Sequence, residues 1–176
     1  SVPMTEHAFI EPECAIAIPE GEGLLLYTGS QSVYDEQKEI SRMLQIDPSL
    51  VRSQTKLVGG GFGGKEDMSV QHHAALMAYY TKKPVKVKFS RQESLNIHTK
   101  RHAMEIDITT ACDEEGNITA TKAYILSDCG AYASLGGPVL QRACTHAGGP
   151  YNFQNIEIVG ECVYTNNVPG GACRGF

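Results

Sequence analysis

The order of apolar and turn-forming segments predicts an α+β fold with mixed or antiparallel strands and two main helices. Two pairs of strand-like segments are each joined by a short turn that contains acidic residues and glycine, which is typical of hairpins. Two longer segments show helical spacing of apolar residues, and strands and helices do not alternate regularly as in a doubly wound sheet. Apolar residues make up 41% of the 176 residues and charged residues 20%, which is ordinary for a globular protein.

The first half of the chain contains both main helices. Ser32, with Asp35 three residues later, resembles a capping box, and Asp47-Pro48 ends the helix that follows. Lys82-Lys83-Pro84 ends the second helix, because proline cannot continue it. We expect strands at residues 13–18, 23–28, 51–58 and 85–89 and helices at residues 33–45 and 65–80.

The second half of the chain consists mainly of strands. The turn at residues 113–117 (DEEGN) lies between two apolar segments and predicts a hairpin. A looser glycine-bearing segment follows, and turn-forming residues occupy 166–171. We expect strands at 104–110, 118–127 and 156–164 and a short helix at 139–147. Because no linker or low-complexity segment interrupts the chain, residues 1–176 are expected to form a single α+β unit.

Charge and hydropathy narrow the class of protein. Fifteen Lys and Arg residues stand against 20 Asp and Glu residues, and this net charge of −5 favours neither nucleic acid nor a membrane as a partner. No apolar run approaches the roughly 20 residues that a membrane-spanning helix needs. The first residues lack the basic and apolar regions of a signal peptide, so we expect a cytoplasmic protein.

The six cysteines are scattered along the chain. No pair has CxxC or CxC spacing, so zinc ribbons, thioredoxin-type redox pairs and the common iron–sulfur patterns find no support. The even number allows three disulfides, but a chain of this length and apolar content does not need them. We therefore expect reduced cysteines that pack as small apolar side chains. They are Cys14, Cys112, Cys129, Cys144, Cys162 and Cys173.

Glycines gather at residues 59–64, where the sequence GGGFGG leads into Lys65-Glu66. Five glycines in six residues expose bare backbone, which permits left-handed conformations and close approach of N–H groups to a ligand. The helix expected to begin at Lys65 adds its own free N–H groups and positive dipole end. An anion or an oxo group is therefore the natural ligand of this loop.

Three alternatives compete for the glycine loop. Residues 59–65 satisfy the GxxxxGK pattern of a phosphate loop, but Glu66 stands where a magnesium-binding Ser or Thr is required. They also satisfy GxGxxG, yet no acidic residue follows at the distance that dinucleotide binding needs. The third alternative is a tight turn that only lets a strand and a helix pack closely, and five glycines in six residues followed by Lys-Glu favour a ligand-binding loop over it.

The string VGGGFGGKE at residues 58–66 resembles the cofactor-binding region of the xanthine dehydrogenase and aldehyde oxidase family of molybdenum hydroxylases. Other segments resemble the same family in the same order: EHAFIEPEC at 6–14, YTGSQ at 27–31 and ACRGF at 172–176. The resemblance extends over the whole chain. It implies a partial molybdopterin-binding domain, as a fragment of a larger molybdenum subunit.

The resemblance implies that four residues contact the cofactor. Gln31 would donate a hydrogen bond from its side-chain amide to the apical oxo ligand of molybdenum. Phe62 and Gly63 would line the metal with backbone, with an amide directed at an oxo group. Arg174 would anchor the cofactor through its backbone and side chain. No residue of the chain is expected to ligate the metal directly, and Gly175 stands where the carbon monoxide dehydrogenase branch has a copper-binding cysteine.

Three residues would bind the substrate, and they imply the purine-oxidising branch of the family. Glu66 and Arg142 occupy the positions of the glutamate and the arginine that hold the ring from opposite sides. A carboxyl group pairs with the N–H and N edge of a heterocycle, and a guanidinium stabilises charge that builds on a ring carbonyl oxygen. Phe176 would stack on the flat ring. Each of these residues also has an alternative role without substrate binding. These roles are a carboxylate at a helix N-terminus for Glu66, a solvated charge for Arg142 and a core aromatic for Phe176.

The family reaction is hydroxylation of a carbon next to a ring nitrogen by molybdenum-hydroxide attack and hydride transfer. Electrons then pass to iron–sulfur clusters and FAD, which the resemblance places on other domains or subunits. The molybdopterin is either simple or a cytosine dinucleotide. The catalytic glutamate of the family lies beyond its ACRGF-type segment, so we expect the chain alone to be inactive. The alternatives are a phosphate-loop nucleotide-binding domain, or oxidation of another N-heterocycle such as nicotinate, or of an aldehyde.

Overall fold

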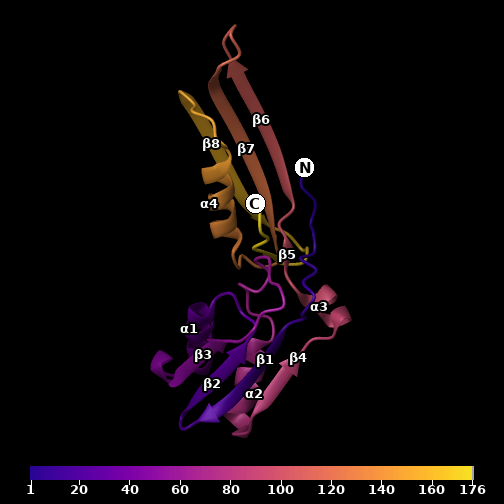
Figure 1. The fold of residues 1–176 in the computed structure, drawn as a ribbon, viewed down its shortest axis with the longest axis vertical. Helices are drawn as coiled ribbons and strands as arrows, with labels where there is room; N and C mark the ends of the chain where they lie inside the picture. The colour runs from indigo at the N-terminus through magenta and orange to yellow at the C-terminus, as the bar shows by residue number, and fades with distance from the viewer. Residues whose placement is uncertain (176) are drawn as a thin grey trace. The chain divides into compact units, whose positions relative to one another are not determined.

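The computed structural model describes residues 1–175, and Phe176 lies outside this range. The chain forms two compact units (Figure 1). One comprises His7–His98, and the other comprises Ser1–Glu6 together with the residues from Thr99 onward. The single α+β unit expected over the chain is thus divided into two units, each with strands, helices and a core of its own. The α+β class is confirmed.

The unit His7–His98 is built on a four-stranded sheet in the order β3-β2-β1-β4. Strand β2 pairs antiparallel with β1 and parallel with β3, and β4 pairs antiparallel with β1. All four strands match the segments predicted from apolar alternation to within two residues at their starts and ends, except that β3 stops three residues early. The elements are β1 (Cys14–Glu20), β2 (Gly23–Thr28), α1 (Val33–Leu44), a short 3-10 helix (Pro48–Leu50), β3 (Val51–Thr55), α2 (Gln71–Thr81), β4 (Val85–Lys88) and α3 (Arg91–Ile97).

Helices α1 and α2 pack on one face of this sheet (Figure 1). Small side chains form the contact between α2 and the sheet, because Ala74 and Ala78 of the helix meet Ala15 and Ala17 of β1 in one buried cluster. Short side chains let the helix approach the strand closely, so the packing is dense without large residues. Ile40 of α1 extends the same core.

The predicted start of the second helix is wrong. Helix α2 begins at Gln71 and not at Lys65, and residues 65–70 form turns and bends. The Gln71 side chain accepts hydrogen bonds from the N–H groups of Ser69 and Val70, at 2.9 and 3.0 Å, and so satisfies the two backbone donors just before the helix. The glycine loop is therefore not followed directly by a helix dipole.

Two other details of the helices differ from expectation. Ser32 does not cap α1 through a backbone bond, since its hydroxyl donates to the Asp35 carboxylate instead. Helix α3 was not predicted, although Ser90 and Glu93 form a capping box at its start. Seven residues are too few to show helical spacing of apolar side chains, so the box was the available signal.

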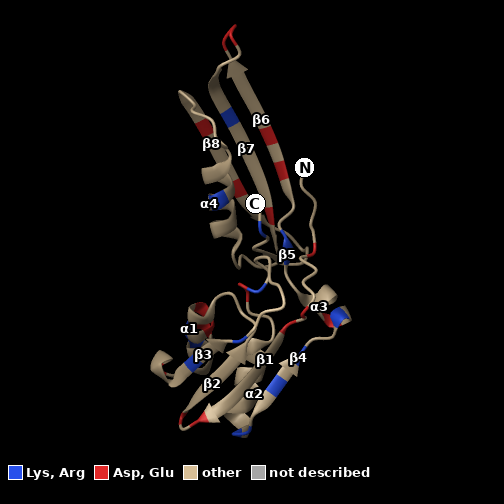
Figure 2. Ribbon diagram, in the orientation of Figure 1, with Lys and Arg blue, Asp and Glu red and all other residues tan. Residues whose placement is uncertain are grey.

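The second unit contains a three-stranded sheet in the order β6-β7-β8. Strands β6 and β7 form the predicted hairpin, whose acidic turn Figure 2 shows at the far end of the two strands. Strand β8 returns parallel to β7 after α4, which packs on both strands. Strands β5 and β9 form a separate parallel pair. The elements are β5 (Lys100–Arg101), β6 (Met104–Cys112), β7 (Ile118–Gly130), α4 (Gly136–His146), β8 (Asn155–Tyr164) and β9 (Gly170–Gly171).

The expectation of six reduced cysteines is wrong for one pair. Cys129 at the end of β7 is bonded to Cys162 on β8, 33 residues away in the sequence. The parallel pairing of β7 with β8 brings them together, and local spacing does not reveal it. Disulfides are more common in oxidising compartments, so the cytoplasmic location stays a prediction. None of the helices in residues 1–175 is both long and apolar enough to cross a membrane.

Candidate cofactor-binding site

The glycine loop, residues 59–64, is tied at both ends by the carboxylate of Glu11. Glu11 Oε2 accepts hydrogen bonds from the Gly59 N–H at 2.7 Å and from the Lys65 Nζ at 2.9 Å. Burial raises the pKa of Glu11, but the bonds from Lys65 and Gly59 and the charges of Lys65 and Lys88 outweigh burial and lower it overall. The carboxylate therefore stays charged and holds the first residue of the loop to the residue that follows it.

Lys65 points into the protein and not toward a ligand. Its side chain is only 4% exposed, and its ammonium lies 4.7 Å from the centre of the Phe9 ring, besides its bond to Glu11. A phosphate loop needs this lysine free to reach phosphates, and it needs a helix directly after the loop. Neither condition is met, so the phosphate-loop alternative is wrong for this structure.

Gln31, three residues after β2, forms a second set of hydrogen bonds that clamps the loop, in addition to those of Glu11. Its side-chain Oε1 accepts hydrogen bonds from the N–H groups of Gly63 at 3.1 Å and of Lys65 at 3.2 Å. Its own backbone N–H donates to the Lys65 carbonyl at 2.8 Å. Because backbone N–H groups only donate, the amide of Gln31 must turn its oxygen toward the loop. Among residues 1–175 its NH2 group has no hydrogen-bond partner, so it is left as a donor.

The contact between Gln31 and the loop requires glycine, because a side chain at Gly61 would not fit. A Cβ on Gly61 would lie 2.4 Å from Gln31 Oε1, so any larger residue would displace the clamp. The next residue, Phe62, has φ +53°, a left-handed conformation that non-glycine residues rarely adopt. Its ring is 57% exposed, so burial does not explain the strain. Strained backbone of this kind is common where a protein contacts a ligand.

The N–H groups of the turn show which amide is available for a ligand. Those of Gly63 and Lys65 donate to Gln31, and that of Gly64 donates to the Gly61 carbonyl at 2.8 Å. Among residues 1–175, the N–H groups of Gly60, Gly61 and Phe62 have no such partner. The Phe62 N–H, together with those of Gly60 and Gly61, is therefore left as a donor for a ligand, whereas the Gly63 N–H is already bonded to Gln31.

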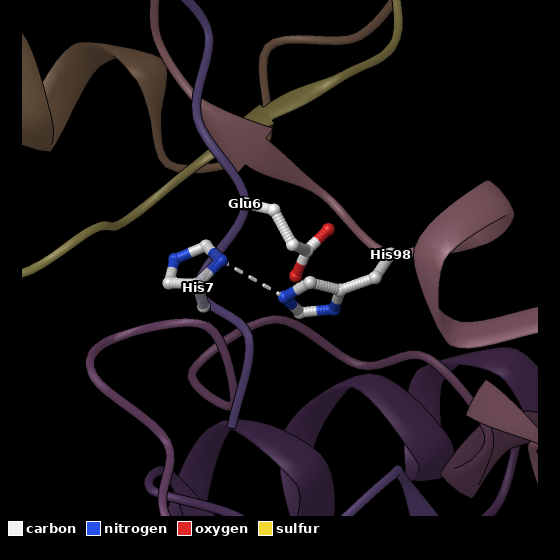
Figure 3. A group of neighbouring side chains, drawn as sticks. All are labelled: Glu6, His7 and His98. Atoms are coloured by element: carbon white, nitrogen blue, oxygen red, sulfur yellow. Dashed lines mark hydrogen bonds between the residues drawn. The ribbon is translucent and has the colours of Figure 1, made fainter. Parts of the chain in front are cut away.

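A buried pair of histidines lies under the loop and was not predicted. His98 Nε2 is 3.2 Å from His7 Nδ1, and the two rings meet edge to face (Figure 3). On its other side, His98 Nδ1 lies 2.8 Å from Oε1 of Glu13. Burial raises the pKa of Glu13, but bonds from His98, from its own backbone N–H and from Ser94 outweigh it and lower the pKa overall. No local pattern could reveal this group, because His7 and His98 are 91 residues apart.

Glu66, the first predicted substrate residue, lies directly after the loop and is partly buried. Its N–H donates to the Gly63 carbonyl at 3.2 Å. The purely structural alternative for Glu66 is a carboxylate that stabilises the start of a helix. Helix α2 begins only at Gln71, well after this residue. That explanation therefore fails, and Glu66 remains a candidate for ligand binding.

The other predicted site residues belong to the second unit. Arg142 is exposed on α4, and Arg174 follows β9. The backbone carbonyl of Arg174 accepts a hydrogen bond from the Arg101 guanidinium at 2.9 Å, which holds the segment after β9 beside β5. Phe176 lies outside the described residues. The structure thus brings Gln31, Phe62, Gly63 and Glu66 together in one unit, and it places Arg142 and Arg174 in the other.

The donor set of the loop fits a cofactor that brings its own metal ligands. Around Gly61 the protein offers the amide of Gln31, whose oxygen is held by the loop, and backbone N–H groups that no side chain covers. Such groups donate hydrogen bonds to oxygen atoms, whereas protein-ligated metals require thiolate, imidazole or carboxylate ligands. A molybdopterin cofactor, which brings its own sulfur and oxo ligands to the metal, would fit these donors through hydrogen bonds to its oxygen atoms.

Comparison with known proteins agrees with this chemistry. The molybdopterin cofactor-binding domain family matches residues 1–176. The nicotinate dehydrogenase large molybdopterin subunit of Eubacterium barkeri is 42% identical over 97% of this chain, and the chain covers 40% of that protein. A probable xanthine dehydrogenase subunit of Bacillus subtilis is 39% identical over 99% of the chain, which covers 24% of it.

A solved structure shows the same fold. The aldehyde oxidoreductase of Desulfovibrio gigas superposes with a TM-score of 0.94 at 27% identity, over 99% of this chain and 19% of that protein. The chain thus spans well under half the length of the proteins that it resembles. The chain belongs to the molybdopterin cofactor-binding domain family, in the xanthine dehydrogenase and aldehyde oxidase group of molybdenum hydroxylases.

Proposed function

We propose that this chain forms the cofactor-contacting part of a molybdenum hydroxylase that oxidises an aromatic N-heterocycle of the purine type. The observation that carries the proposal is the clamp of Gln31, whose oxygen is used by the loop and whose NH2 group is left to donate. When bound, the molybdenum cofactor would supply the Lewis acid that activates the oxygen nucleophile and accepts the electrons of the substrate.

The residues of the chain would orient the cofactor and stabilise its oxygen atoms. The Gln31 NH2 group and the Phe62 N–H are donors fixed in place before the cofactor arrives, so little reorganisation is needed during the reaction. The absence of a side chain at Gly61 leaves room for the Gln31 amide, and Gly63 would keep side chains away from the metal. Arg174 would hold the cofactor from the segment after β9.

Three residues would recognise the substrate. The carboxyl group of Glu66 would pair with the N–H and N edge of the heterocycle. The Arg142 guanidinium would stabilise negative charge on a ring carbonyl oxygen. Phe176 would stack on the ring face. The failure of the helix-start explanation for Glu66 supports its place in this set.

Nicotinate is the second candidate substrate. It is favoured by the 42% identity to a nicotinate dehydrogenase subunit, which slightly exceeds the 39% identity to the xanthine dehydrogenase relative. Nicotinate is also a planar N-heterocycle with an anionic oxygen, so a guanidinium such as that of Arg142 would suit it. We further propose that iron–sulfur and FAD domains or subunits receive the electrons, and that the pterin is simple or carries a cytosine nucleotide.

The test is a substrate panel on the full natural enzyme. Metal analysis should find molybdenum, and hypoxanthine, xanthine, nicotinate and an aldehyde should be compared as substrates. Glu66→Ala should reduce turnover of the preferred heterocycle much more than it reduces stability. Glu114→Ala, in the exposed turn of the β6–β7 hairpin, serves as the control and should leave turnover unchanged.

Each outcome of the panel decides one part of the proposal. Absence of molybdenum would overturn the proposed function as a whole. Turnover of nicotinate without purine turnover would transfer the assignment to the second candidate, and turnover of the aldehyde alone would reject an N-heterocycle. A Glu66→Ala variant that merely unfolds would show that Glu66 has a structural role.

A further inference from the structure

We propose that the buried relay of Glu13, His98 and His7 is a positioning element that fixes the Gln31 donor toward the cofactor. This inference rests on the proposed function, because it assigns a role to residues behind the cofactor-facing loop. None of the three was predicted as a site residue, and all belong to the unit His7–His98.

The relay is a continuous and buried chain of close polar contacts, of which the one between the two histidines is a hydrogen bond. Glu13 is 4% exposed, His98 2% and His7 9%. His98 Nδ1 lies 2.8 Å from Glu13 Oε1, and because a carboxylate only accepts, a neutral His98 beside it carries its proton on Nδ1. His98 Nε2 then shares a hydrogen bond of 3.2 Å with His7 Nδ1 (Figure 3). The carboxylate thus fixes the tautomer and the orientation of one ring, and that ring fixes the next.

Gly64 rests directly on the bond between the two rings. A Cβ on Gly64 would lie 2.6 Å from His98 Nε2 and 2.8 Å from His7 Cγ. The backbone of the loop therefore approaches the histidine pair as closely as a glycine allows. The distance between the rings sets the position of this peptide, because neither ring can move without breaking a buried hydrogen bond.

The same peptide segment holds Gln31. The residues on either side of Gly64 are Gly63 and Lys65, and their N–H groups are the two donors to Gln31 Oε1. A displacement of Gly64 is passed to both donors and so rotates or shifts the side-chain amide. The path from Glu13 to the Gln31 NH2 group contains only direct contacts within one unit.

A pair of substitutions at His7 separates a hydrogen-bonding role from mere space filling. His7→Asn keeps a polar group near the position of Nδ1, whereas His7→Leu has a similar bulk and cannot bond to His98. His73→Leu, at an exposed histidine of α2, is the matched control. The full-length holoenzyme is purified for each variant, and its molybdenum content, the electron paramagnetic resonance signal of the reduced molybdenum centre, kcat and KM are measured.

We expect His7→Leu to change the resonance signal in the same direction as Gln31→Ala and to lower kcat by about 10- to 100-fold, with a smaller change in KM. His7→Asn should restore most of the signal and of kcat, and His73→Leu should match the wild type. If His7→Leu does not fold, His98→Asn provides the same comparison, because it keeps the bond to Glu13 and loses the bond to His7.

Two results would overturn the inference. One is a folded His7→Leu enzyme with wild-type signal and kcat, and the other is a His7→Asn enzyme as impaired as His7→Leu. Both leave the proposed function intact as long as the wild-type enzyme contains molybdenum. A wild-type enzyme without molybdenum would instead reject the proposed function itself.

Discussion

Substitution of Gly64 by alanine tests the packing of the glycine loop on the histidine pair. Gly64 does not have a positive φ, so alanine can adopt its backbone conformation without strain. The expected effect is therefore steric alone. The new Cβ would lie 2.6 Å from His98 Nε2 and 2.8 Å from His7 Cγ, whereas ordinary contact begins at about 3.4 Å.

The expected loss of stability follows from the displacement of the two histidine rings by the new methyl group. Both rings are buried, so forcing a methyl group between them and the loop is an overpacking change that costs about 1–3 kcal/mol. Separation of the rings also breaks the hydrogen bond between His98 and His7, which contributes about 1 kcal/mol. We expect Gly64→Ala to lower the free energy of unfolding by about 2–4 kcal/mol.

The assay is urea unfolding of the full-length protein, with hydrogen exchange at Gly63 and Lys65 as the local measurement. Gly137→Ala is the matched control, because Gly137 lies in helix α4 with open space around it. It should be neutral or stabilising by up to about 1 kcal/mol, as alanine favours helix. A Gly64→Ala protein within about 0.5 kcal/mol of the wild type, with unchanged protection of both amides, would refute the reasoning.

Three further predictions concern the clamps and the strained residue. Glu11→Gln leaves the buried Lys65 ammonium without its charged partner and should cost about 1–3 kcal/mol at pH 7, less than a fully buried pair because Glu11 is 39% exposed. Because folding lowers the pKa of Glu11, this difference in stability is fully present above pH 4.5 and should shrink as the pH falls through the folded pKa. Urea unfolding of the wild type and of Glu11→Gln from pH 7 to pH 3 measures the difference. A difference that does not change with pH would contradict the prediction. Phe62→Gly removes the strain of φ +53° and keeps the backbone N–H, so it should leave stability unchanged or raise it by about 1 kcal/mol. A clear loss of stability by calorimetry would show that the ring is structurally required. Gln31→Ala should speed hydrogen exchange of the Gly63 and Lys65 amides in the protein without cofactor, and unchanged exchange would mean that the clamp is not formed in solution.

The sequence predicts most of the strands because their signal is local. Alternation of apolar residues predicts β1, β2 and the β6–β7 hairpin directly. Strands β5 and β9 contain two residues each, which is too short for any pattern. The start of α2 was misplaced because apolar spacing continues into residues 65–70, while the side chain of Gln71 bonds to the backbone just before the helix and the helix begins there.

The site was predictable only where its residues lie in one motif. The cluster of glycines indicates a ligand by itself, and the resemblance to molybdenum hydroxylases adds Gln31 and Glu66 to it. The inward turn of Lys65 was not predictable, because its partner Glu11 lies 54 residues away. The histidine relay and the bond between Cys129 and Cys162 depend in the same way on contacts between distant segments.

The central claim is that the amide of Gln31 faces a molybdenum cofactor, and a comparison of two glutamine variants tests it most directly. Electron paramagnetic resonance of the reduced molybdenum centre should be recorded for the full-length enzyme, for Gln31→Ala and for Gln154→Ala, an exposed glutamine of the other unit. We expect a changed molybdenum signal in Gln31→Ala and a wild-type signal in Gln154→Ala. A wild-type signal in Gln31→Ala, or no molybdenum signal in the wild-type enzyme, would contradict it.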